Sequence, residues 1–284
     1  MLHGLEGTIR SHYIGGVMES ARARGWGVVL MMHRGCGEAP NTARRFYHSG
    51  ETSDLDFVFR EFSRRYAGSQ WLLAGVSLGG NVLLKWLGER AHDVDPAIAA
   101  AAAISVPFDL EAGARHISEG FARVYDRRFL KTLRRKALDK LRRYPDLFER
   151  DRLERAANIF EFDDAVTAPV HGFRDAVDYY RRSSSISFLD RIRVPTFLLS
   201  AVDDPFLPPQ VLDRVKTAVR GNERIELEIT ARGGHVGFVE GPLPWKARYY
   251  AEDRAFRFFD RVLEAASRDS YDSSRHHSIP SETS

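Results

Sequence analysis

Residues 71–80, with the sequence WLLAGVSLGG, limit the possible folds of this chain more than any other stretch. A short apolar run typical of a strand ends in the pattern Gly75-x-Ser77-x-Gly79, and residues 81–90 continue with helical spacing. A serine at a sharp turn between strand and helix projects its hydroxyl clear of the backbone, and small neighbours leave room for the turn and a substrate. Because small residues also pack helices on strands, this interpretation requires a base, an acid and an oxyanion hole elsewhere.

The pattern of apolar residues predicts an α/β fold. Strand-like runs lie at residues 26–32, 71–76, 97–106, 194–202 and 225–229, and helical patterns at residues 11–24, 52–66, 81–90 and 245–263. This alternation is typical of a mostly parallel sheet with helices on both faces. The run at 26–32 is continuous, as expected of a strand that is buried on both faces.

The alternation divides the chain into four predicted parts. Residues 1–107 form the first part of the core, and residues 108–189, which are mostly helical, form an inserted cap. Residues 190–265 form the second part of the core. Residues 266–284 are rich in serine, charge and histidine with little to bury, so we expect a disordered tail.

Composition excludes few classes of protein. The 284 residues are 43% hydrophobic and 29% charged, which is enough for a substantial core, and the net charge of +3 makes no global case for nucleic-acid binding. The single cysteine, Cys36, excludes an intrachain disulfide, and no apolar run reaches the roughly 18 residues of a membrane span, so we expect a cytoplasmic protein. Cys36 has no evident activating partner and is predicted to be a packed residue.

The loops that follow the last two predicted strands contain a candidate base and a candidate acid. His235 lies in a glycine-rich loop after the last predicted strand, and Asp203 and Asp204 follow the strand before it. A histidine suits the base because its pKa near neutrality lets it accept the proton of Ser77 and return it to a leaving group. A surface histidine in a glycine loop is the alternative. The order serine, aspartate, histidine favours the catalytic interpretation.

The oxyanion hole is predicted at two backbone amides. Residues 3–7 (HGLEG) have the pattern of a turn that presents N–H groups, and we expect the amide of Leu5 to act together with that of Leu78, which follows the elbow serine. A flexible glycine-rich segment is the alternative for residues 3–7.

Residues 129–144 predict a basic amphipathic helix within the cap. Its apolar side chains share one face, and most of its lysines and arginines lie on the other. Such a helix can make transient contact with an anionic membrane surface. The alternative is a solvated helix packed on the core.

Several motifs together resemble the YheT-like α/β-hydrolases. They are HGLEG (3–7), HRGCG (33–37), YHSGE (47–51), GVSLGGN (75–81), the segment 162–180, DDP (203–205) and GGHVGF (233–238). The resemblance covers about residues 3 to 265 in order. It implies an α/β-hydrolase fold with a helical cap and a serine carboxylic-ester hydrolase that acts through an acyl-enzyme and needs no cofactor or metal.

The resemblance also implies substrates and roles. Short- to medium-chain acyl esters or monoacylglycerol-like lipids would be cleaved by Ser77 as nucleophile and His235 as base. In hydrolases of this architecture the acid commonly precedes a proline by about four residues. Asp204 has this relation to Pro208, so Asp204 is predicted to orient His235, with Asp203 as the alternative acid or as a cap of the turn.

Two other functions stay open. An alcohol O-acyltransferase could use the same three residues, as acyl transfer in some relatives implies. A noncatalytic membrane-surface or partner-binding protein is the alternative from another class. Members of the family normally carry strands upstream of the HGLEG turn, whereas two residues precede it here, so we expect residues 26–32 to lack strand neighbours. A start codon assigned too late, or a truncated sequence, would account for this difference.

Overall fold

The computed structural model describes residues 1–240 and 248–276. Its centre is a parallel sheet with the strand order β1-β2-β3-β4. The strands are β1 (Trp71–Val76), β2 (Ile98–Ile104), β3 (Thr196–Ala201) and β4 (Ile225–Thr230). The strands predicted at these places, and the α/β fold class, are confirmed.

The register of the sheet aligns the carboxyl ends of the strands. Val76 pairs with Ile104, Ile104 with Leu199, and Ala201 with Thr230. Because parallel strands end at the same edge, the loops that follow β1, β3 and β4 meet there, and this edge is where α/β sheets place their sites.

Residues 1–3 lie in the sheet beside β1. Leu2 forms parallel bridges with Gly75 and with Met31, and its amide donates to the Ala74 carbonyl at 2.8 Å. The prediction of a strand at 26–32 is wrong except for the bridge at Met31. A strand needs a partner along its length, and Met1 and Leu2 pair only with the end of this segment, at Val29 and Met31. Residues 26–30 are also half-buried or exposed, rather than buried on both faces.

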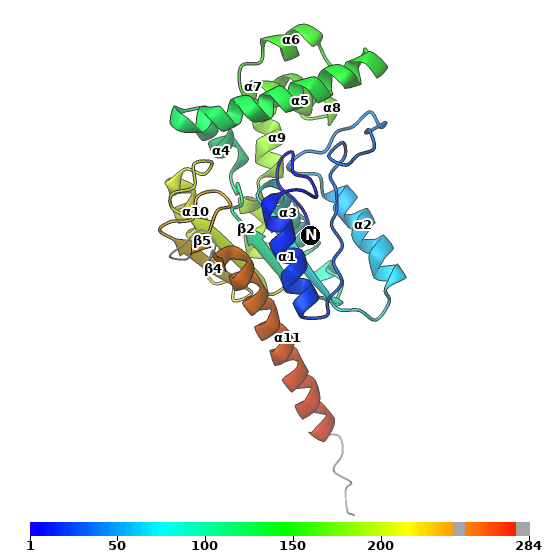
Figure 1. Ribbon diagram of the computed structural model, residues 1–284, viewed down its shortest axis with the longest axis vertical. Helices are drawn as coiled ribbons and strands as arrows, with labels where there is room; N and C mark the ends of the chain where they lie inside the picture. The colour runs from blue at the N-terminus through cyan, green and yellow to red at the C-terminus, as the bar shows by residue number, and fades with distance from the viewer. Residues whose placement is uncertain (241–247, 277–284) are drawn as a thin grey trace, which may run out of the picture.

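Helices cover both faces of the sheet (Figure 1). On one face α2 (Thr52–Arg65), α3 (Leu78–Arg90) and α10 (Pro209–Ala218) bury their apolar side chains. On the other face α11 (Tyr250–His276) packs on the sheet, with α1 (His12–Ala23) beside it. The central helix α3 is buried nearly all around, which holds the elbow before it in a fixed place.

The C-terminal helix corrects two predictions. It begins at Tyr250, after a short antiparallel pair of β5 (Val239–Glu240) and β6 (Arg248–Tyr249), and the predicted start at residue 245 lies outside the described residues. It continues to His276, so disorder is the wrong prediction for residues 266–276 (Figure 1). Once a helix is nucleated, each added residue gains a hydrogen bond, which extends α11 past its packed part. Residues 277–284 lie outside the described part.

The predicted cap segment forms a layer of helices at one end of the molecule (Figure 1). We call α4–α9 the helical layer. Its elements are α4 (Leu110–Ile117), the 3-10 turn η2 (Gly120–Ala122), α5 (Arg123–Arg143), α6 (Arg150–Arg155), α7 (Ile159–Phe162), the π-turn η3 (Asp163–Thr167), α8 (Ala168–Val170) and α9 (Ala176–Ser183). Helices α5, α6 and α7 share an apolar cluster of their own. Short 3-10 turns follow α3 and α9, at η1 (Ala91–Asp93) and η4 (Ser185–Arg191).

No helix in the described ranges is both long enough and apolar enough to cross a bilayer.

Candidate active site

Ser77 occupies a strained turn between β1 and α3. Its backbone has φ 54° and ψ −123°, a left-handed φ that a residue with a side chain rarely adopts. Its amide donates to the Ile104 carbonyl at 2.8 Å, and its carbonyl accepts from the Asn81 amide at 3.1 Å. A Cβ at Gly75 would lie 2.6 Å from the Gly79 carbonyl oxygen, so glycine is needed there for the turn to close. This is the elbow expected from the sequence.

The structure brings Ser77, His235 and Asp204 together. His235 Nε2 lies 2.8 Å from Ser77 Oγ, and His235 Nδ1 lies 2.9 Å from Asp204 Oδ2 and 3.1 Å from Oδ1. With the ring proton on Nδ1 donated to the carboxylate, Nε2 is free to accept the serine hydroxyl proton. Asp204 is 3% exposed, whereas Ser77 and His235 are partly exposed. The arrangement joins a serine hydroxyl, an imidazole and a buried carboxylate in one hydrogen-bonded series.

The two adjacent aspartates have different partners. Asp204 Oδ1 also accepts from the Phe206 amide at 2.8 Å. Asp203 Oδ1 accepts from the Gly234 amide at 2.8 Å, in the loop that carries His235. The geometry therefore places Asp204, and not Asp203, against the imidazole.

The HGLEG turn borders Ser77. A Cβ at Gly4 would lie 3.1 Å from Ser77 Cβ, and one at Gly79 would lie 2.6 Å from the His3 carbonyl oxygen, so the two segments approach as closely as glycine permits.

The amides of the HGLEG turn differ in their partners. The Gly4 amide donates to the Tyr13 hydroxyl, the Glu6 amide to the Tyr47 hydroxyl and the Gly7 amide to the Gly4 carbonyl, each at 3.0 Å. Within the described ranges, the Leu5 amide and the Leu78 amide have no hydrogen-bond partner in the protein. These are the two donors predicted from the sequence, and both are available to a ligand.

Two buried histidines hold the HGLEG turn from behind. The His33 amide donates to His3 Nε2 at 3.1 Å, and His3 Nδ1 donates to the Gly4 carbonyl at 2.8 Å. His33 Nε2 returns a hydrogen bond to the His3 carbonyl at 3.1 Å. Burial, and secondarily the neighbouring His3, lower the pKa of His33 to about 3. Burial also lowers the pKa of His3. The low pKa makes His33 neutral near pH 7, and the His3 ring is neutral because its Nε2 accepts the His33 amide. The two rings fix the position of the turn.

Glu6 adds a contact that the sequence analysis missed. Its backbone has φ 54°, and its carboxylate accepts from the Tyr47 hydroxyl at 2.7 Å and from Lys136 Nζ of α5 at 2.8 Å. A strained conformation persists where several contacts determine it, and here the Tyr47 hydroxyl binds both the amide and the side chain of Glu6. Nothing in the sequence pattern links residues 6 and 136.

The Asn81 side chain connects α3 to two other segments by hydrogen bonds. This fully buried side chain donates to the carbonyls of Ser49 and Ser183 at 2.8 and 2.9 Å and accepts from the Ser185 amide at 2.9 Å. It thereby connects the elbow helix to the loop before α2 and to the end of the helical layer.

An aromatic side chain, Phe206, lies against His235. The Phe206 ring centroid is 4.2 Å from that of His235, and Tyr125 and Phe129 of α5 contact Phe206 at centroid distances of 5.0 and 6.1 Å. The helical layer therefore gives the site an apolar side.

Cys36 and a group of two histidines and a glutamate lie outside the series of Ser77, His235 and Asp204. Cys36 is buried and burial raises the pKa of its thiol, which confirms a packed residue. His48, Glu51 and His171 lie within 4.8 Å of one another. However, His48 Nδ1 accepts from the Gly50 amide, so the proton sits on Nε2, the nitrogen that faces Glu51, and Arg45 lies 3.5 Å from that carboxylate. These donors do not suit a cation.

The sequence of residues 1–242 matches the family described as alpha/beta hydrolase fold. The chain therefore belongs to the α/β-hydrolase family, as its sheet and serine elbow indicate. It is 39% identical over 269 residues to YheT of Escherichia coli (strain K12), a protein named as an esterase, in an alignment that covers 94% of this chain and 77% of YheT. The resemblance to YheT-like α/β-hydrolases is confirmed.

Two further relatives extend the comparison. Phospholipase ABHD3 of Mus musculus is 31% identical over 264 residues, covering 93% of this chain and 63% of ABHD3, so the chain spans less than two thirds of that relative. The Pyrococcus furiosus esterase Pf2001 has a TM-score of 0.57 and 17% identity over 92% of this chain and 80% of its own, which shows the shared fold. The chain thus belongs to a family of carboxylester hydrolases.

Proposed function

We propose that this chain is a serine esterase in which Ser77 forms an acyl-enzyme. The observation that carries the proposal is the continuous series from Ser77 Oγ through the His235 ring to Asp204. Ser77 Oγ attacks the ester carbonyl carbon while its proton passes to His235 Nε2. Asp204 holds the tautomer of the ring and stabilises the imidazolium that forms.

The amides of Leu5 and Leu78 bind the oxyanion of the tetrahedral intermediate. Their lack of protein partners supports this role, and loss of one such donor typically costs about 3 kcal/mol of barrier. The intermediate breaks the ester C–O bond, and His235 gives its proton to the leaving alcohol. Water then attacks the acyl-enzyme with His235 again as base, which releases the carboxylic acid and restores Ser77.

The substrates we propose are short- to medium-chain acyl esters or monoacylglycerol-like lipids. The aromatic side chains of Tyr125, Phe129 and Phe206 beside His235 support an apolar acyl or alcohol group at this place. The phospholipase name of the mouse relative is consistent with a lipid ester.

A fluorophosphonate probe tests the nucleophile. Wild type should be labelled and Ser77→Ala should not. Ser105→Ala is the matched control, because Ser105 also follows a strand, has φ 53° and is 1% exposed, yet its Oγ has no hydrogen-bond partner among the described residues. Labelling that survives Ser77→Ala would refute the nucleophile, and a wild type that resists the probe would favour the noncatalytic alternative.

Two substrate experiments separate the remaining possibilities. p-Nitrophenyl esters of increasing chain length should show highest kcat/KM at short to medium length. Hydrolysis with added ethanol should still yield mainly free acid. Predominant formation of the ethyl ester would instead assign the alcohol O-acyltransferase.

A further inference from the structure

The outward face of α5 carries a row of cations. Arg127, Arg128, Lys131 and Arg135 are all exposed. Arg127 and Arg128 lie four and three residues before Lys131, and Arg135 lies four residues after it, so the four share one side of the helix. None of the four forms an ion pair within residues 1–240 and 248–276. Their charge is therefore not neutralised by the described protein.

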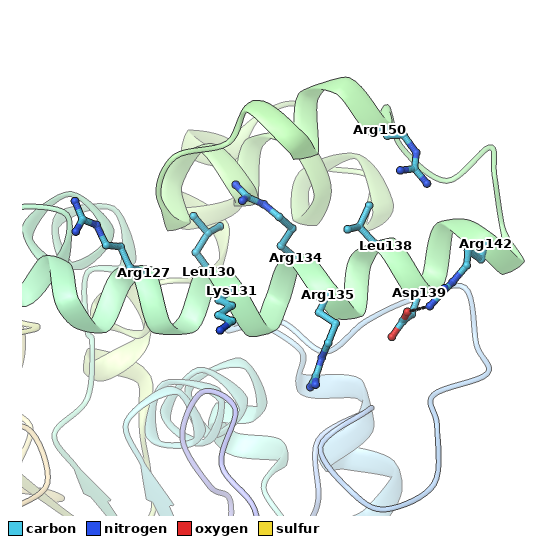
Figure 2. Close-up of a pocket in the computed structure, with 9 residues that line it drawn as sticks. All are labelled: Arg127, Leu130, Lys131, Arg134, Arg135, Leu138, Asp139, Arg142 and Arg150. Carbon is cyan, nitrogen blue, oxygen red and sulfur yellow. Dashed lines mark hydrogen bonds and ion pairs between the residues drawn. The ribbon is translucent and has the colours of Figure 1, made fainter.

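Three of these cations, Arg127, Lys131 and Arg135, line a groove of about 600 Å³ between α5 and α6 (Figure 2). Leu130 and Leu138 supply its apolar lining, and Arg142 and Arg150 stand at its end near α6. Asp139 is the acidic residue of the lining, and it pairs with Arg142. The groove therefore combines positive charge with apolar carbon.

Apolar side chains are exposed at the beginning of the same helix. Phe121 is 78% exposed, Val124 58% and Tyr125 37%. Val124 shares the face of the cations, and Tyr125 contacts Phe206 beside His235. The apolar end of α5 is thus the end that reaches the candidate active site.

We propose that the surface from Phe121 of η2 to Arg142 of α5 docks on an anionic lipid bilayer. Its charge complements acidic headgroups, and its apolar end suits the boundary between headgroups and acyl chains. Nucleic acid would neutralise the same cations, but its backbone offers no apolar layer to cover Phe121 and Val124, which favours lipid. Docking in this orientation brings the beginning of α5, where Tyr125 contacts Phe206, towards the bilayer.

Vesicle sedimentation tests the surface without turnover. The full chain carrying Ser77→Ala is mixed with vesicles of phosphatidylcholine alone or with 30% phosphatidylglycerol, in 0.1 M salt. Binding should require the anionic lipid and weaken with salt. Because the Ser77→Ala chain cannot form an acyl-enzyme, this result is independent of the proposed esterase activity.

Two triple variants locate the surface. Arg128→Gln, Lys131→Gln and Arg135→Gln together should weaken binding about a hundredfold, at about fivefold per cation. The control combines Arg22→Gln, Arg220→Gln and Arg224→Gln, which removes the same charge from exposed residues outside the helical layer and should change binding little. Equal losses in both variants would overturn the proposal.

Two further measurements complete the test. In the Ser77-intact chain, the α5 variant should cleave a water-soluble short-chain ester like wild type, which shows that it is folded. Phe121→Ser with Val124→Ser should also weaken vesicle binding. Unchanged vesicle binding of that variant, with tighter binding to a DNA oligonucleotide than to vesicles, would assign a general polyanion surface and overturn the lipid proposal.

Discussion

Lys136 Nζ of α5 lies 2.8 Å from the carboxylate of Glu6, so the helical layer is ion-paired to the turn that borders Ser77. The Glu6 side chain is 9% exposed and that of Lys136 26%. The same carboxylate accepts a hydrogen bond from the Tyr47 hydroxyl. The position of α5 and the shape of the proposed oxyanion turn are therefore linked through one carboxylate.

Lys136→Met should lower kcat about tenfold with little change in KM, because a small displacement of the Leu5 amide weakens binding of the transition state more than of the substrate. Steady-state kinetics with a soluble ester measures this. Lys140→Met is the control, since Lys140 Nζ of α5 donates hydrogen bonds to the carbonyls of Asn41 and Ala43, away from the turn. Equal kcat values for the two variants would argue against the link.

The two aspartates should respond differently to conversion into asparagine. Asp204→Asn should lower kcat by about 10³ to 10⁴, because the amide favours the wrong imidazole tautomer. Asp203→Asn should cost less than about tenfold, since its side-chain oxygen can still accept from the Gly234 amide. The comparison uses kcat at saturating ester, and a larger loss for Asp203→Asn would reverse the assignment.

Asn81→Ala should destabilise the fold by about 3 kcal/mol. It leaves two carbonyls and one amide without their partner in a buried place. Urea unfolding measures the change. Asn158→Ala, which removes the cap of the short helix α7, should cost about 1 kcal/mol. A smaller loss at Asn81 than at Asn158 would show that the three segments do not depend on this side chain.

Stability should fall as the pH is lowered below about 6.5. Burial lowers the pKa of His33 to about 3, so between these values the unfolded chain binds a proton that the folded chain does not. This group adds stability in full above pH 6.5 and loses about 1.4 kcal/mol per pH unit as the pH falls. Urea unfolding at pH 6.5 and 5.5 should show a smaller difference for His33→Gln than for wild type. His92→Gln, at an exposed position, should behave like wild type.

Much of the fold follows from local patterns. Strands β1 to β4 and most of the helices on the sheet appear where apolar spacing predicts them. An element that is buried on one face or on both has its apolar residues at regular spacing in the sequence. Residues 26–32 show the limit of such patterns. The apolar run does not indicate which other segment is available to form backbone hydrogen bonds with these residues. In the structure, Leu2 forms a parallel bridge with Met31.

Part of the site could be found in the same way. The elbow at Ser77 and the loops of Asp204 and His235 follow strands, so chain order suffices to bring them to one edge. The position of Pro208 favours Asp204 over Asp203, and the directions of the two side chains place Asp204 against His235. The ion pair between Glu6 and Lys136 depends on how α5 lies over the turn, which periodicity does not report.

Strands β2 and β3 are neighbours in the sheet, although the whole helical layer lies between them in the sequence. The chain leaves after Ile104 and returns at Thr196, on strands that pair with each other. Pairing within the sheet therefore does not depend on the length of what is inserted. A different segment between β2 and β3 would therefore leave the strands that position Ser77, Asp204 and His235 in place. A replacement segment would still have to supply a cation for Glu6.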